Sequence, residues 1–390
     1  MPKIRAAATA QLSPPARRNL LKWTGVLAAA AGAGLATARA QQRNAEAAGG
    51  AAAGEATGPL RRGMVGYMLA HEQFPAPELV QLGALATRGG FHLLATSDHL
   101  QPWQANERHC GEAWVTLGAL GAQAPQGWMG TTVTCPTFRY NPAVVAEAFA
   151  TLDLLYPGRI FLGVGSGEAL NEQAAIGNWP KWQERWDRLI EAITIIRRLW
   201  TGAPVSHKGT YYTVDAKLYD PPARPIPLLT AANGRKSMRL AGQHGDGLIT
   251  DPETWKKHKS EWEEGARAAG KNPADMPVLV EQYVVVGNDA DARQAAELWR
   301  FGPKAFKGYY NIPDPTEIQQ KAEAEVPIEK VLASWAIGTD PAVHVAKLRE
   351  LFDSGATIVN VHSGQPDQRR VIQFYAQNVL PKFRQPVVSR

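Results

Sequence analysis

The sequence predicts a single α/β domain built as a (β/α)8 TIM barrel with insertion loops, and three observations support this fold class. From residue 64 onward, short apolar runs alternate with segments of helical periodicity, which is typical of parallel strand–helix units. The apolar runs number eight, as a barrel of this kind requires. They lack polar alternation, as expected for strands packed on both faces. With 390 residues and 45% hydrophobic content, the chain can bury such a domain.

The expected strands are apolar runs bounded by polar or turn-forming residues. In chain order they are Met64–Leu69, His92–Ser97, Met129–Cys135, Ile160–Gly165, Pro227–Ala232, Gly247–Thr250, Val278–Val286 and Thr357–His362.

The clearest helix is Trp182–Trp200, where large apolar residues recur every three or four positions. Its tryptophan stripe is interpreted as packing against the barrel and not as a cofactor site. Further helices are expected from about Pro142, from about Gln365, and over Thr254–Ala269 and Pro341–Asp353.

Two intervals are too long for simple crossovers. Residues 201–226 are expected to form a small hairpin or loop excursion, and residues 300–336 a loop with a short helix. Long excursions in compact domains are often binding loops.

The first 40 residues have the layout of a secretory signal, with Arg17 and Arg18 before a weakly apolar run from Val26 to Ala36 and small residues at Ala38 and Ala40. The paired arginines indicate a twin-arginine signal, so we expect contact with the twin-arginine translocase and export to the periplasm or cell envelope. The apolar run is too short and too glycine-rich to span a bilayer. Residues 41–62 are interpreted as a flexible linker and residues 63–390 as the catalytic domain.

Charge gives no indication of a nucleic-acid partner. Residues 1–40 hold six basic residues and no acid, and removing these six from the 42 bases of the chain leaves 36 against 36 acids. The formally neutral remainder lacks the basic footprint of a nucleic-acid-binding protein.

Neither a metal centre nor a disulfide framework is predicted. The two cysteines, Cys110 and Cys135, are expected to be free buried thiols, with pairing in an oxidising compartment left open. His99, His109 and Cys110 lack a recognised ligand spacing. A G-x-S-x-G elbow, the main feature of many serine hydrolases, is absent from the sequence.

Polar residues follow several of the expected strands, where TIM barrels carry their catalytic groups. His99 is the best candidate base because imidazole titrates near working pH, although a structural histidine is an equal alternative on position alone. Glu168 lies in a glycine-rich turn that can approach a ring or a phosphate, or that can simply be a tight turn capped by an acid. These strand-end groups are Glu72, Asp98 with His99, Thr137 with Arg139 and Tyr140, Ser166 with Gly167, Glu168 and Asn171, and Ala232 with Asn233 and Gly234.

Longer motifs carry a family resemblance. The segments Glu72-Gln73-Phe74, Ser97–Trp103, Cys135–Pro142 and Phe161–Glu172 closely resemble the coenzyme F420-dependent glucose-6-phosphate dehydrogenase group of the luciferase-like superfamily. The exported branch of hydroxymycolic acid dehydrogenases is still more similar, through its twin-arginine signal, Ser97–Gln104 and residues 327–341. The resemblance implies a luciferase-like barrel, coenzyme F420 as cofactor with FMN as the alternative, and a homodimer.

The resemblance also assigns roles. His99 matches the base that takes the hydroxyl proton, Glu168 the acid that serves the ring nitrogen, Trp103 the aromatic residue beside the substrate, and Glu72 a pocket carboxylate. A non-proline cis peptide is expected at Thr132-Val133. The positions that match cofactor-lining residues are Asp98, Thr132, Val133, Ser166, Gly167, Asn171, Ala231, Ala232, Asn233 and Gly234.

The chain departs from the family at the phosphate of the sugar. Two lysines and an arginine of the sugar-phosphate enzymes align with Glu253, Tyr309 and Ser334, and a dianion without cationic partners is poorly held. Tyr309 and Ser334 are therefore expected in a more apolar substrate pocket, which suits a simple or lipid-like secondary alcohol. Lys236, Lys256 and Lys257 keep the sugar phosphate as a second candidate substrate. The motifs are also compatible with an FMN-dependent monooxygenase or with a non-catalytic deazaflavin carrier.

Overall fold

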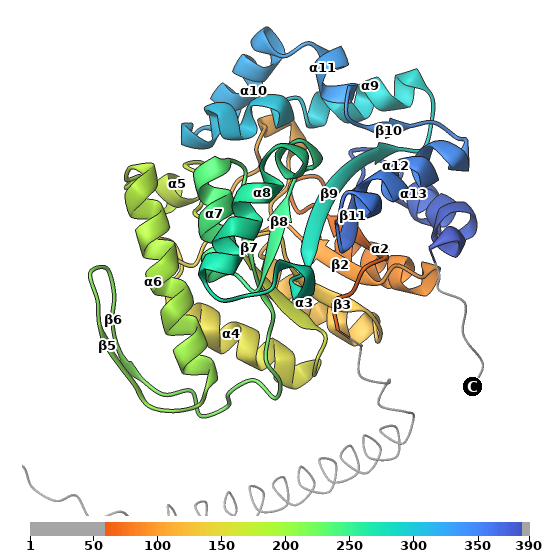
Figure 1. Ribbon diagram of the computed structural model, residues 1–390. Coiled ribbons are helices and arrows are strands. Elements are labelled where there is room, and N and C mark those ends of the chain that lie inside the picture. The colour runs from red at the N-terminus through yellow and green to blue at the C-terminus, as the bar shows by residue number, and fades with distance from the viewer. Residues whose placement is uncertain (1–58, 384–390) are drawn as a thin grey trace, which may run out of the picture. The chain divides into compact units, whose positions relative to one another are not determined.

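Residues 59–383 are described by the computed structural model, and within them eight parallel strands close into a barrel. The expected fold class is confirmed. The barrel strands are β1 (Met64–Leu69), β2 (Leu93–Thr96), β3 (Trp128–Thr131), β4 (Ile160–Val164), β7 (Leu228–Ala231), β8 (Gly247–Thr250), β9 (Val278–Val285) and β11 (Ile358–His362). Each strand pairs in parallel with its neighbours, and the pairs β8–β9, β9–β11 and β11–β1 close the ring (Figure 1).

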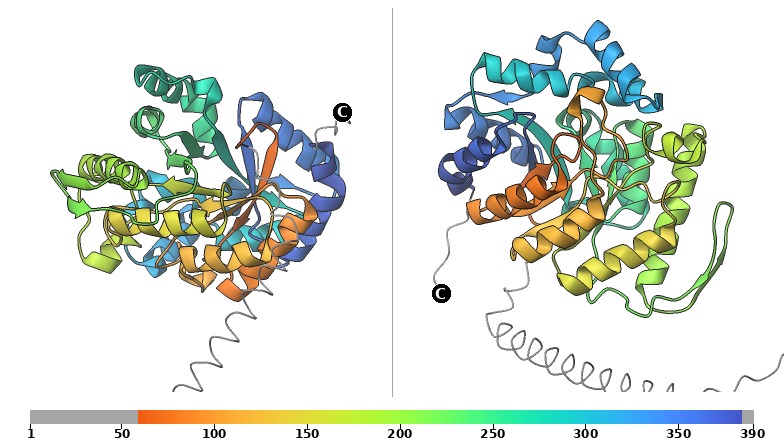
Figure 2. Two further views of the ribbon diagram at one scale, coloured as in Figure 1. Left: turned by 90° about the horizontal axis from the view of Figure 1, so that it is seen from below. Right: turned by 180° about the vertical axis from the view of Figure 1, so that it is seen from behind.

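Helices surround the barrel on the outside (Figure 2). The helices that cover the strands are α2 (Ala76–Gly89), α3 (Ala113–Gln123), α4 (Pro142–Leu155), α6 (Trp182–Trp200), α7 (Arg235–His244), α8 (Pro252–Ala268), α12 (Pro341–Asp353) and α13 (Gln368–Phe374). Helices α5 (Glu172–Ile176), α9 (Asp289–Leu298), α10 (Pro315–Glu325) and α11 (Ile328–Leu332) belong to the connections at the carboxyl ends of the strands.

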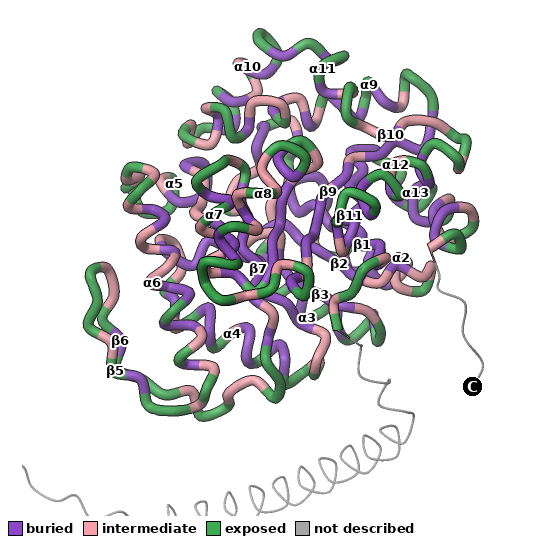
Figure 3. The backbone as a smooth tube through the Cα atoms, viewed as in Figure 1, coloured by how far each residue is buried: buried purple, intermediate pink, exposed green. Residues whose placement is uncertain are grey.

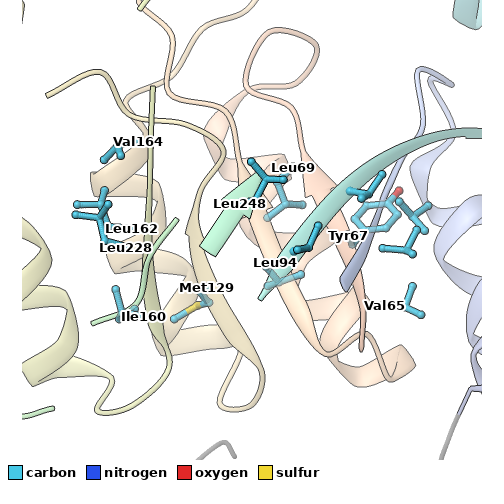
Figure 4. Close-up of a cluster of buried hydrophobic side chains, with 14 of the residues drawn as sticks. Val65, Tyr67, Leu69, Leu94, Met129, Ile160, Leu162, Val164, Leu228 and Leu248 are labelled. Carbon is cyan, nitrogen blue, oxygen red and sulfur yellow. The ribbon is translucent and has the colours of Figure 1, made fainter. Parts of the chain in front are cut away.

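The strands bury both of their faces, as their apolar sequences predict (Figure 3). Val65, Tyr67 and Leu69 of β1 point toward the helices and join the larger core cluster (Figure 4). Met64 and Met68 alternate with them and point into the barrel, because successive side chains of a strand face opposite ways. Residues from all eight strands fill the barrel interior, which is therefore a packed core and no channel.

Most of the expected elements are confirmed. Strands Met64–Leu69 and Gly247–Thr250 and helix Pro341–Asp353 have the expected bounds. The helix Trp182–Trp200 has the expected limits, and Trp186 of its stripe is 2% exposed within the core. Residues 201–226 hold the expected hairpin, β5 (Val205–Lys208) with β6 (Thr213–Ala216). In the part of the chain that the structure describes, no helix is long and apolar enough to cross a membrane.

Three expectations need correction. Strand β3 ends at Thr131 and not at Cys135, because the chain leaves the ladder there and meets β4 again only at a single bridge, Thr134 with Val164. Residues 300–336 hold α10, α11, two 3-10 helices and the short strand β10 (Ala336–Ile337) in place of a loop with one short helix.

The third correction concerns the last helix, which begins at Gln368 and not near Gln365. The side chain of Asp367 caps it by accepting a hydrogen bond from the backbone N–H of Arg370. The secretory signal and all but the end of the linker fall outside the described residues.

Candidate active site at the carboxyl end of the barrel

Polar side chains gather at the carboxyl ends of neighbouring strands, above the apolar barrel interior. Glu72 follows β1, His99 follows β2, and Glu168 follows β4. In the sheet, β2 lies between β1 and β3, and β3 pairs with β4. The three groups therefore face one mouth, where TIM barrels carry their catalytic residues.

His99 is held between a carboxylate and an amide. Its Nε2 lies 3.7 Å from Glu72 Oε1, and both side chains are almost buried, at 10% and 3% exposed. The Ser97 hydroxyl donates to the other oxygen of Glu72 at 2.5 Å, which fixes the carboxylate. On the other side of the ring, Nδ1 lies 3.3 Å from the carbonyl of Gln101 and 3.2 Å from Nδ2 of Asn171.

Asn171 links the two acid–base candidates. Its Oδ1 accepts from the backbone N–H groups of Leu100 at 2.8 Å and Gln101 at 3.3 Å, which sets the orientation of the amide. Nδ2 then faces both His99 Nδ1 and Glu168 Oε2, the latter at 3.3 Å. The residue expected to line the cofactor site thus also positions His99 relative to Glu168.

This arrangement allows His99 to act as a base. Nδ1 is either protonated and donates to the Gln101 carbonyl, or it accepts from the Asn171 amide. In the first tautomer the Nε2 lone pair is free toward the mouth, and Asn171 donates to Glu168 alone. When Nε2 takes up a proton, the resulting imidazolium faces the carboxylate of Glu72. An opposite charge at this distance stabilises the charged ring.

Asp98 faces the opposite way from His99, as expected for adjacent residues of an extended chain. Its carboxylate accepts hydrogen bonds from Thr134 at 2.6 Å, Arg139 at 2.6 Å and Tyr140 at 3.2 Å. Arg139 also donates to the backbone carbonyl of Asp98 at 2.6 Å. The side chain is thus held by this cluster, and its predicted contact with the cofactor stays a prediction.

A second buried carboxylate completes the cluster around Arg139. Glu172, at the start of α5, accepts the backbone N–H of Arg139 at 3.1 Å and lies 3.5 Å from its Nε. Burial raises the pKa of Glu172 to about 7, against the opposing charge of Arg139. Burial lowers the pKa of Arg139, but the charges of Asp98 and Glu172 outweigh this effect and the net shift is upward. The guanidinium therefore stays charged.

The backbone at the ends of β3 and β4 fits a flat ring. The expected non-proline cis peptide is present at Thr132-Val133. A Cβ at Gly165 would lie 2.6 Å from Val133 Cγ2, so the two segments are in close contact only because glycine has no side chain. Gly167 has φ +81°, a left-handed conformation that glycine adopts without strain.

The start of α7 fits an anionic group. Gly234 caps the helix, and its first turn holds Arg235 and Lys236 and no acid. Free N–H groups and the helix dipole favour anions at such an end. The remaining expected cofactor positions, Ser166, Ala231, Ala232 and Asn233, lie between these two regions along the strand ends. Together they suit a planar ring with a negatively charged tail.

An aromatic wall flanks His99. Trp103, 6% exposed, lies 5.9 Å from the His99 ring, between ring centres, and stacks on Phe301 at 4.7 Å. Phe306 meets Trp103 edge-on at 6.0 Å. Residues far apart in sequence thus give one side of the mouth an apolar surface.

The positions that replace the phosphate-binding residues bring no cation to His99. The Tyr309 hydroxyl donates to Glu325 at 3.1 Å, although its ring packs in the aromatic cluster. Ser334 is exposed and Glu253 lies 3.9 Å from Lys307. Among residues 59–383, neither Glu72 nor Glu168 forms an ion pair with a lysine or arginine.

Both cysteines are free thiols, as expected. Cys110 donates from Sγ to the carbonyl of His99 at 3.3 Å, and burial raises its pKa. It therefore supports the backbone of His99 as a neutral thiol and is not a thiolate nucleophile.

Sequence reasoning missed two polar residues of the mouth, Glu281 on β9 and His362 on β11. The signal available was a carboxylate and an imidazole within two mainly apolar strands. Their pairing depends on the contact of β9 with β11, which a strand pattern does not reveal.

The chain belongs to the luciferase-like monooxygenase family, whose model matches residues 62–357. Among its relatives, the F420-dependent hydroxymycolic acid dehydrogenase of Mycobacterium tuberculosis is 47% identical over 329 residues, covering 84% of this chain and 89% of that protein. The F420-dependent glucose-6-phosphate dehydrogenase of Microbacterium testaceum is 40% identical over 333 residues, covering 84% and 98%.

A solved structure of an F420-dependent secondary alcohol dehydrogenase in complex with an F420-acetone adduct superposes with a TM-score of 0.79 at 32% identity. The match covers 83% of this chain and all of that one. The resemblance that the motifs predicted is confirmed.

Proposed function

We propose that this protein is a coenzyme F420-dependent oxidoreductase that transfers hydride between a secondary alcohol, or the corresponding carbonyl, and the deazaflavin ring. The observation that carries the proposal is the link from Glu72 through His99 and Asn171 to Glu168. It holds a base and an acid at fixed positions around one mouth, beside backbone that suits a flat ring.

The residues divide the proton transfers between them. Coenzyme F420, when bound, supplies the carbon that accepts or returns the hydride. His99 Nε2 takes the hydroxyl proton of the alcohol, and Glu72 stabilises the imidazolium that forms. Glu168, by its resemblance to the family acid, serves the ring nitrogen. Trp103 and the aromatic wall exclude water from the reacting atoms.

The charge of the mouth favours an uncharged alcohol. Glu72 is a carboxylate beside His99, and the nearby guanidinium of Arg139 is occupied by Asp98 and Glu172. A phosphate dianion placed there would meet repulsion without compensating ion pairs.

Glucose 6-phosphate is the second candidate substrate. The relative from Microbacterium testaceum that is named for this activity is 40% identical to this chain, against 47% for the hydroxymycolic acid dehydrogenase. Lys236, with its ammonium 6.0 Å from the Trp182 ring at the start of α7, is a cation that could serve such a substrate.

A cofactor and substrate assay tests the proposal. Purified protein is titrated with oxidised F420 and with FMN, and binding is followed by fluorescence quenching. We expect tight binding of F420 and weak binding of FMN. The holoenzyme is then assayed by loss of F420 absorbance with 2-butanol and with glucose 6-phosphate, and we expect 2-butanol to be preferred. Tight FMN binding without F420 binding would overturn F420 as the proposed cofactor. A clear preference for glucose 6-phosphate would overturn an uncharged alcohol as the proposed substrate.

A further inference from the structure

A second carboxylate–histidine pair lies at the same mouth, opposite Glu168. His362 Nδ1 donates to Glu281 Oε1 at 2.7 Å. The two residues come from adjacent strands, β11 and β9 (Figure 1). Two residues before Glu281, Leu279 fills the barrel interior, and Ile358 does so four residues before His362. Because side chains of a strand alternate, Glu281 and His362 also point inward, above the apolar core.

The pair is continuous with the acid–base groups already described. Strand β11 lies between β9 and β1, so His362 is placed between Glu281 and the end of β1 that carries Glu72. Burial raises the pKa of Tyr283 well above its usual value, and the charges of Glu281 and Glu72 add to the shift.

The histidine is fixed and the carboxylate is open. The His362 side chain is 2% exposed and is held between Tyr283, stacked at 4.3 Å, and Trp299, edge-on at 4.3 Å. The Glu281 side chain is 22% exposed. The immobile ring thus holds a partly exposed carboxylate in one position at the mouth.

Buried polar atoms beside the pair also indicate a ligand. His362 Nε2 and Asn360 Oδ1 are buried without a hydrogen-bond partner among the described residues. Buried polar atoms are normally paired. Asn360 stands in register with Glu281, on the same inward face of the neighbouring strand. The unmet hydrogen-bonding capacity therefore belongs to β11: Nε2 is on the ring edge away from Glu281, and Asn360 Oδ1 lies close to Gly66 of β1.

We propose that Glu281, held by His362, determines specificity by accepting a hydrogen bond from a second, uncharged hydroxyl of the substrate. This inference rests on the proposed function and names its substrate class: neutral alcohols with another hydroxyl near the carbinol carbon, and not phosphate esters. Glu281 would contact the substrate, while His362 is a positioning residue that acts through Glu281. No lysine or arginine among residues 59–383 forms an ion pair with Glu281 that would neutralise it.

Further aromatic rings lie beside the Glu281–His362 pair. Tyr283 stacks on Trp335 at 5.0 Å with an interplanar angle of 12°. Tyr283 also stacks on His362, so aromatic rings lie beside the carboxylate and make its surroundings largely apolar. A substrate hydroxyl directed at Glu281 would be discriminated from a hydrogen at that position, because a site built to pair with a hydroxyl rejects the analogue that lacks it.

The test compares two alcohols with the same carbon skeleton, 2-butanol and 2,3-butanediol, on wild-type holoenzyme, Glu281→Gln and His362→Asn. The measured quantity is the ratio of kcat/KM for the diol to kcat/KM for 2-butanol. We expect Glu281→Gln to lower this ratio by about tenfold or more, since hydrogen bonds to charged groups are among the stronger ones. The loss should fall on KM for the diol, and His362→Asn should shift the ratio in the same direction by less.

Glu329→Gln is the matched control, because its carboxylate is exposed and pairs with Arg293 on the outer surface. It should leave the ratio unchanged. An equal loss for both alcohols in Glu281→Gln would mean a structural role and would overturn the inference, as would an unchanged ratio.

A binding measurement separates this inference from the proposed function. Trp299 packs against the His362 ring, so intrinsic tryptophan fluorescence can report 2,3-butanediol binding without turnover. If wild-type holoenzyme oxidises neither alcohol, the proposed function fails. The inference is then decided by fluorescence alone: weaker diol binding by Glu281→Gln than by Glu329→Gln supports it, and equal binding overturns it.

Discussion

At the scale of single residues, the site depends on how each side chain is held. His99 has a defined partner on both ring nitrogens, with Glu72 at one and the Gln101 carbonyl and Asn171 at the other. A base that is already oriented loses little entropy on reaching the transition state. A buried structural histidine is held by partners in the same way, so the role of His99 as the base stays a prediction.

Replacing His99 tests that interpretation. His99→Ala should lower kcat by about 10²–10⁴-fold, the usual contribution of a positioned general base. Affinity for F420 should change little, because the ring is expected to rest on the backbone of β3 and β4. The measurements are steady-state F420 reduction and F420 titration.

His109→Ala is the control for His99, since it removes an imidazole from the same connection but not from the acid–base link. It should keep most of the wild-type turnover. Unchanged turnover in His99→Ala would exclude His99 as the base.

Some residues of the site could be predicted from the sequence and others could not. Glu72, His99 and Glu168 were predictable because each follows a strand, and strand ends meet at one mouth. The opposite directions of Asp98 and His99 followed from strand alternation. Glu281 and His362 were not found, because a charge within an apolar strand has no interpretation until the neighbouring strand is known.

At the scale of elements, Arg139 joins three parts of the chain. Its guanidinium lies between Asp98 at the end of β2 and Glu172 at the start of α5, and the residue itself follows β3. Asp98 immediately precedes His99, and Asn171 immediately precedes Glu172. The cluster therefore sets the relative positions of the base and of the amide that links it to Glu168.

Arg139→Met should destabilise the fold by about 3–5 kcal/mol, the range found when one partner of a buried ion pair is removed. Two buried carboxylates would lose their cation. Denaturant unfolding measures the loss, and remaining folded protein should show reduced kcat.

Arg197→Met serves as its control, because Arg197 pairs with Asp246 where both side chains are more than a third exposed. Such surface pairs contribute little to stability, so the free energy of unfolding of this variant should lie within about 1 kcal/mol of that of wild type. Equal stability of the two variants would contradict the buried role of Arg139.

Element boundaries were predictable where local chemistry marks them. Proline at the first turn and a capping side chain start α4 and α12, through Asn141 and Asp340. The same signal, Asp314 before Pro315, starts α10 within the segment expected to be mostly loop. That segment was misjudged because α10 carries few apolar residues, and its buried Ile318 and Ala322 pack in an aromatic cluster from distant parts of the chain.

At the scale of the whole molecule, the eight strands and the barrel could be predicted from the sequence. The register between neighbouring strands, which decides which side chains meet at the mouth, could not. Closure brings β1 beside β11, nearly 300 residues later in the chain. Glu72 and His362 thus share one mouth only after the last strand has joined the barrel. The cofactor and substrate sites therefore exist only in the folded domain.

This dependence bears on the proposed route of export. We propose that the chain is exported by the twin-arginine translocase to the periplasm or cell envelope, since Arg17 and Arg18 precede a weakly apolar run. A route that carries folded proteins would allow F420 to bind before translocation, at a site that an unfolded chain does not possess.

Conservative replacement of the arginine pair tests this route. With Arg17 and Arg18 both changed to Lys, the charge is kept but the twin-arginine pattern is lost, and full-length protein should accumulate inside the cell. Lys22→Arg, a charge-preserving change just beyond the pair, should be exported normally. Cell fractionation measures the distribution, and N-terminal sequencing of exported wild-type protein should begin at Gln41, after Ala38-Arg39-Ala40. Normal export of the double-lysine variant would show that another signal directs the protein, and F420 would then have to bind after translocation.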